Sequence, residues 1–249
     1  PSFLLQKEII IFDYSSPLYV LFNIVAGHSF YVNQSVAFVL VVITAFVTNK
    51  VIVDNEITGK TSLLASFIYI MLSSALSTFT FMNPYLWVSL LLLIMVNSLF
   101  NIPKTKFTIS VVFNASFFLG LAVLFFYPVV IFLIVIWAAL MTFRISSWRE
   151  YIVSLIGVFL PLFLVFVGYF FYDAHEIFIS NFKSSLALDF KIIDRDILDI
   201  IVLILILGML IPSVFAVVGS MMEKSIVVRQ KMSVSLWLLF VSVSAINWI

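Results

Sequence analysis

The 249-residue sequence contains no cysteine, two histidines and only seven each of glycine and proline. The lack of cysteine excludes disulfides and thiolate metal sites, and His28 and His175 are too far apart in sequence to indicate a metal centre. Gly-rich phosphate loops and the common hydrolase and zinc motifs are also absent. With a net charge of +1 and no basic run, we expect no nucleic-acid partner. Because cofactor-binding motifs are absent, we also expect no cofactor.

Apolar residues dominate what is present. They make up 64% of the chain against 10% charged residues, and the mean hydropathy is +1.25. Eight stretches approach the length of ~20 residues that a membrane crossing needs. The sequence therefore predicts one all-α domain, residues 1–249, which is a polytopic transmembrane helical bundle with about eight crossings. The predicted crossings cover residues 35–49, 62–81, 85–101, 107–126, 129–143, 151–172, 197–218 and the run from 233 onward.

Two shorter apolar segments precede the first predicted crossing. Residues 1–12 lack a starting methionine and resemble the end of an earlier helix, and the last run stops inside an apolar stretch. These features predict a fragment with at least one helix missing before residue 1. Serine followed by Pro17 is a helix start signal. Because the run from there to Gly27 is too short to span, we expect residues 15–26 to lie along the membrane surface.

The basic residues are divided unequally between the predicted loops. Nine of the 13 fall in alternate loops, which predicts that this side is cytoplasmic. Most of the acidic residues fall on the other side. The nine are Lys50, Lys60, Lys104, Lys106, Arg144, Arg149, Lys224, Arg229 and Lys231.

Asp13 and His28 are the candidate catalytic residues, because both flank the short segment on the outer side. A carboxylate at this position could act as a general base, and a histidine could transfer protons. The alternatives are a helix cap for Asp13 and an interfacial anchor for His28. The acids between residues 173 and 199 could collect a divalent cation, although their spacing fits a solvated loop better.

Ionisable residues are missing from the middle of the predicted crossings. Buried charges usually accompany ion coupling, so their absence argues against a proton-driven pump. Asn97 and Asn114 are the largest polar side chains within the crossings, and we expect them to make interhelical hydrogen bonds.

Three features of the sequence together form one pattern. They are FNASFFLGLAVLFFYP at residues 113–128, then Arg144, Trp148 and Arg149 after the next helix, and Pro17, Leu18 and Tyr19 at the head of the short segment. Over about residues 13–172 this pattern resembles the polytopic C-type glycosyltransferase superfamily, whose members use polyprenyl-phosphate sugars. Residues 113–128 also resemble a family of inner-membrane proteins of Bacteroidota that implies no activity. Both resemblances imply a bacterial inner membrane.

The sequence departs from the superfamily pattern where charge is expected. Asp13 matches the acid that serves as base, but Tyr14 stands where a neighbouring acid is usual and Asn83 where a second outer acid often occurs. Phe126 and Tyr127 replace a basic residue that would face the donor phosphate. The resemblance therefore implies either an enzyme or a relative that has lost its activity.

Three hypotheses follow. The first is a lipid-linked sugar transferase, whose partners would be membrane lipids and a polyprenyl-phosphate-linked sugar held by Lys183 or Arg195. The second is a non-enzymatic subunit of an envelope complex, with other membrane subunits as partners. The third is a small-molecule carrier, for which Pro161 and Pro212 would break helices, although no internal repeat supports it.

Overall fold

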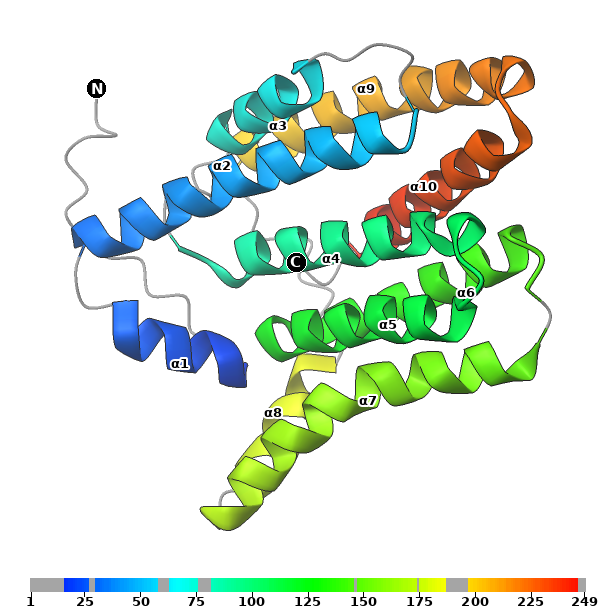
Figure 1. Cartoon of the computed structure of the whole chain (residues 1–249). Helices are drawn as coiled ribbons and strands as arrows, with labels where there is room; N and C mark the ends of the chain where they lie inside the picture. Colours follow the sequence, from blue (N-terminus) through cyan, green and yellow to red (C-terminus); the bar gives the residue numbers. More distant parts are fainter. Residues whose placement is uncertain are drawn as a thin grey trace.

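A computed structural model describes residues 16–26, 30–57, 63–75, 82–145, 147–173, 175–186 and 197–245. Every regular element in these ranges is helical, so the prediction of an all-α chain is confirmed for them (Figure 1). The α-helices are α1 (Pro17–Ala26), α2 (Phe30–Asp54), α3 (Leu64–Ala75), α4 (Pro84–Phe100), α5 (Thr108–Phe125), α6 (Leu133–Thr142), α7 (Trp148–Phe171), α8 (His175–Leu186), α9 (Ile197–Ser220) and α10 (Ile226–Ala245). Three 3-10 segments are η3 (Ile102–Lys104), η4 (Tyr127–Phe132) and η5 (Met221–Glu223).

Local sequence signals account for several helix ends. The Asn83 side chain accepts a hydrogen bond from the Leu86 amide at 3.0 Å, and Pro84 occupies the first position of α4, where its missing N–H costs nothing. α4 ends before Pro103, which lies in η3. α7 contains Pro161 in its interior, which removes one backbone hydrogen bond and explains the bend of this helix in Figure 1.

Five described helical segments are long and apolar enough to cross a membrane, as in a multi-pass membrane protein. They are Tyr31–Asp54, Pro84–Lys104, Thr108–Phe125, Trp148–Phe171 and Ile226–Val243. The other three predicted crossings correspond to shorter apolar helical segments, Leu64–Ser74, Tyr127–Thr142 and Leu210–Glu223. Five of the eight predicted crossings therefore have a helix long enough to span, and the count of eight stays a prediction.

The centre of the bundle is the row α2, α4, α5 and α7, in which each helix contacts the next (Figure 1). The closest approach is between α5 and α7. A Cβ added to Gly157 would lie 2.0 Å from Ser116 Oγ, and one added to Gly120 would lie 2.6 Å from the Val158 carbonyl oxygen. Small residues thus bring these two backbones together, although the sequence has only seven glycines against 28 phenylalanines.

The helices alternate in direction, so their ends form two opposite groups. We call "basic end" the group where α2, α4, α6 and α9 end and α5, α7 and α10 begin (Figure 1). We call "aromatic end" the opposite group, with α1, α8, the end of α5 and the end of α7. Of the nine basic residues predicted to share one side, the eight that are described lie at the basic end. The predicted grouping of these loops is therefore confirmed, while the side of the membrane they face stays a prediction.

α1 is a ten-residue helix beginning at Pro17, as the sequence predicts. Figure 1 draws it in roughly the same direction as α5, against which it packs. Its rise is ~15 Å, about half the thickness of the hydrocarbon layer. α1 therefore does not cross by itself, and its direction alongside a candidate span argues against the expected position along the membrane surface.

Candidate functional site

The residues proposed for catalysis from the sequence, Asp13 and His28, lie outside the described residues. The same holds for Asp189, Asp194 and Asp196 of the predicted acidic segment. Within the described ranges, no three histidine or acidic residues gather closely enough to hold a metal ion. The candidate site must therefore be built from the helices that surround these positions in the sequence.

Aromatic rings hold α1 in place at the aromatic end. The Phe22 ring lies 4.6 Å from the Trp87 ring of α4, and Trp87 stacks on Phe125 of α5 at 5.4 Å with an angle of 7° between the planes. The hydroxyl of the buried Tyr19 donates a hydrogen bond to the Met82 carbonyl oxygen at 3.4 Å. Offset ring pairs add to the energy of apolar burial, so α1 is a packed part of the bundle.

An apolar groove of about 370 Å³ lies between α1 and the last turns of α7. α1 contributes four residues to its walls, and α7 with the residue that follows it contributes four more, including two tyrosines. Gly168, on that side, has no atom within 4 Å of the place where a Cβ would lie, so the groove is open at this point. The lining residues are Pro17, Leu18, Val20, Leu21, Val165, Gly168, Tyr169 and Tyr172. Such a surface suits a flexible apolar chain with a polar group near the tyrosines.

Three residues that depart from the glycosyltransferase pattern have structural roles. Asn83 is completely buried and caps α4 through its side chain. Phe126 contacts Tyr85 edge to face at 5.1 Å, and Tyr127 does the same with Phe182 of α8 at 5.2 Å. Where the superfamily would hold charge, this chain therefore uses a helix cap and aromatic packing.

Two ionisable side chains lie inside candidate spans, but at the basic end of each helix and not in the middle that the sequence predicts to be free of charge. α7 begins at Trp148 and α10 at Ile226, so Glu150 and Lys231 belong to helices. The Lys231 side chain is 3% exposed, and its ammonium donates to Asn55 Oδ1 at 2.9 Å. Both residues lie near a helix start, which explains why sequence boundaries a few residues too late placed them in loops.

Further polar contacts close the basic end. Gln230 Nε2 donates to the Thr142 carbonyl oxygen at 3.0 Å, which connects α10 to α6. Lys104 Nζ donates to the Asp54 carbonyl oxygen at 3.4 Å, which connects η3 to the end of α2. These bonds satisfy carbonyl groups that helix ends leave without intrahelical partners. Gln230 and Lys104 therefore have a structural role.

The predicted hydrogen bonds of Asn97 and Asn114 are not found, since neither side chain bonds another described residue. Other residues make interhelical bonds: Trp137 Nε1 donates to Ser154 Oγ at 3.0 Å, which connects α6 to α7, and Ser66 Oγ donates to the Ala45 carbonyl oxygen at 2.8 Å, which connects α3 to α2. Asn114 is exposed on the surface of α5.

A comparison of the chain with protein-family models, curated proteins and solved structures finds no match.

Proposed function

We propose that the chain is a multi-pass inner-membrane protein that binds the apolar chain of a lipid-linked sugar in the groove between α1 and α7. The groove is the observation that carries the proposal. It is lined almost entirely by apolar side chains, and its α1 wall begins at Pro17, four positions after Asp13 in the sequence. Exposed apolar residues elsewhere on α7, such as Phe159 at 63%, suit contact with lipid.

In this proposal, the lipid chain rests against α1 and α7 while the sugar-phosphate lies beyond the tyrosines. Asp13 then acts as the base that removes a proton from the acceptor hydroxyl. The resemblance to the C-type glycosyltransferases supports these roles. The loss of charge at Asn83, Phe126 and Tyr127 favours a relative with reduced or altered transfer chemistry.

Lipid binding is tested by filling the groove. Gly168→Leu places a side chain into open space, so the helix packing should survive while the groove becomes occupied. We expect photocrosslinking of a polyprenyl-phosphate probe to the purified chain to fall about tenfold, the effect of losing ~1.4 kcal/mol of binding. Gly208→Leu is the matched control, since Gly208 of α9 is equally open. Equal crosslinking of both variants and the parent protein would contradict the proposed groove.

Catalysis is tested separately by Asp13→Asn. Loss of a positioned base should reduce transfer by ~10²-fold or more, and the composition of envelope glycans in cells provides the readout. If a strain lacking the protein and the Asp13→Asn strain both keep the parental glycan profile, the chain is not a transferase. If only the deletion strain has a changed glycan profile, the protein takes part in glycan assembly but Asp13 is not its catalytic base.

A second candidate function is that of a structural subunit in an envelope complex, and Asn114 is the observation that favours it. Its amide is exposed from a candidate span and bonds no other described residue. A polar group without a partner is costly in hydrocarbon, and amides often bond across helices. Asn114→Leu should therefore shrink the native assembly on gels of mild membrane extracts. An unchanged assembly together with a more stable isolated protein would place Asn114 against lipid instead.

A further inference from the structure

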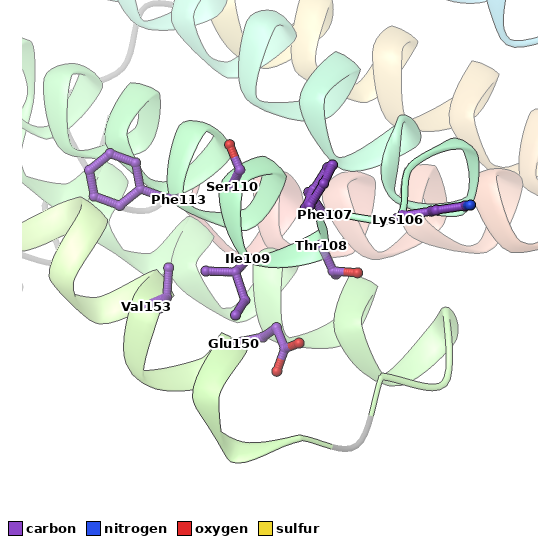
Figure 2. A pocket seen from close by; sticks show the side chains of 8 residues that line it. All are labelled: Lys106, Phe107, Thr108, Ile109, Ser110, Phe113, Glu150 and Val153. Carbon is purple, nitrogen blue, oxygen red and sulfur yellow. The ribbon is translucent and has the colours of Figure 1, made fainter.

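A second groove, at the basic end, combines apolar walls with groups of both charge signs. It occupies about 650 Å³ between the start of α5 and the first turns of α7 (Figure 2). Phe107, Ile109, Phe113 and Val153 form its apolar surface. Phe107 is 79% exposed, so it is available to an amphiphile.

Glu150 of α7 is the unusual residue of this groove. Its side chain is only 8% exposed, and the buried oxygen Oε2 has no hydrogen-bond partner among the described residues. The neighbouring cation of the groove, Lys106, extends away from Glu150 in Figure 2. A buried carboxylate without a paired cation or donor is energetically costly, which points to an external group that completes it.

The start of α7 offers a local explanation for Glu150, which the structure does not support. Ser147 and Glu150 have the spacing of a capping box, in which the serine and glutamate side chains satisfy free amides of the first turn. The Ser147 side chain makes no capping hydrogen bond. The carboxylate oxygen Oε2 is likewise unpaired, so the capping box is not formed.

The opposite wall of the groove is suited to an anion. α5 begins at Thr108 after Phe107, which has no side chain that could cap the helix, so the amides of the first turn lack side-chain partners. Lys106 precedes this turn and lines the same groove. Free helix amides together with a cationic side chain favour phosphate.

We propose that this groove binds phosphatidylethanolamine. The lipid ammonium donates to Glu150, the phosphate is bound by Lys106 and the first turn of α5, and the acyl chains lie along Phe107 and Ile109. The neighbouring Trp148 is 68% exposed at the start of α7, as expected for a side chain at headgroup depth. A zwitterionic headgroup fits because the groove holds one cation, Lys106, and one anion, Glu150, and these two side chains are not paired with each other.

Lipid titrations of the purified full chain in detergent test this site, with dioleoyl phosphatidylethanolamine compared against dioleoyl phosphatidylglycerol by native mass spectrometry. The parent protein should bind the ethanolamine lipid about tenfold more tightly, the scale of a hydrogen bond to a charged group. Glu150→Gln should remove most of this preference. Lys106→Gln should weaken both lipids similarly, and Glu176→Gln on α8, which is exposed, should change neither.

Two results would overturn the site: equal binding of both lipids by the parent protein, or a preference that survives Glu150→Gln. If Glu150→Gln does not fold, Ile109→Trp provides an independent test, because Ile109 is 46% exposed and its replacement fills the apolar wall. That variant should bind both lipids several-fold more weakly. Unchanged binding would again contradict the proposal.

Discussion

The two ends of the bundle are held together by different kinds of contact. At the basic end, long polar side chains reach from one helix to another, as Lys231 does to Asn55 and Gln230 to the Thr142 carbonyl oxygen. At the aromatic end, rings pack against rings, as in the pairs Trp87–Phe125 and Tyr127–Phe182, and the hydrogen bond of Tyr19 to the Met82 carbonyl oxygen accompanies this packing. Hydrogen bonds are directional and depend on single atoms, while ring packing tolerates small shifts. The basic end should therefore be more sensitive to the removal of single polar atoms.

Both ends depend on the close contact of α5 and α7, so the largest effect is expected there. Gly157→Ala would place a methyl group 2.0 Å from Ser116 Oγ and 3.0 Å from the Phe113 carbonyl oxygen. The resulting separation of the helices should cost about 3 kcal/mol and lower the melting temperature in detergent. Gly208→Ala, where a Cβ meets nothing within 4 Å, should be neutral or slightly stabilising. Equal melting temperatures for the two variants would show that α5 and α7 are not packed this closely.

The next largest effect should come from the polar contact at the basic end. Asn55 is 1% exposed and accepts the Lys231 hydrogen bond. Asn55→Ala leaves the buried ammonium without its acceptor and should cost about 2–3 kcal/mol. Lys231→Met removes the charge together with the need for an acceptor, so its cost should be near zero. Chemical denaturation in detergent compares the free energies of unfolding of the two variants. If Lys231→Met destabilises the protein more than Asn55→Ala, the Lys231 ammonium contributes net stability.

The smallest effect is expected at the aromatic end. Trp87 Nε1 is buried and has no hydrogen-bond partner among the described residues. Trp87→Phe removes this donor but keeps a ring against Phe22 and Phe125. The variant should unfold within about 1 kcal/mol of the parent protein. A loss above about 2 kcal/mol in the same denaturation assay would show that this end depends on the specific shape of the indole ring.

The sequence was sufficient for the features that depend on local patterns. The start of α1 at Pro17 follows from residues close together in the chain, and the grouping of the basic loops follows from the alternation of apolar runs and basic loops. The contact of Lys231 with Asn55 joins residues 176 positions apart. Because Arg229, Gln230 and Lys231 interrupt the apolar pattern, the sequence favoured a loop where α10 has already begun.

The close packing of α5 and α7 was also beyond the sequence argument. Seven glycines in 249 residues indicate few close helix contacts, yet Gly120 and Gly157 both lie at one interface. Composition counts small residues but does not place them on facing helix surfaces. The unpaired oxygen of Glu150 is a similar case, since the sequence around Ser147 is that of an ordinary capping box.

We predict that the two ends lie on opposite sides of a membrane, with the basic end in the cytoplasm. The chain has no cysteine, so single cysteines report on each end without further changes. Thr105 follows η3 at the basic end and Glu176 lies in α8 at the aromatic end, and both are exposed. An impermeant maleimide added to intact spheroplasts should label Glu176→Cys, and should label Thr105→Cys only after permeabilisation. Labelling of Thr105→Cys in intact spheroplasts would contradict the account.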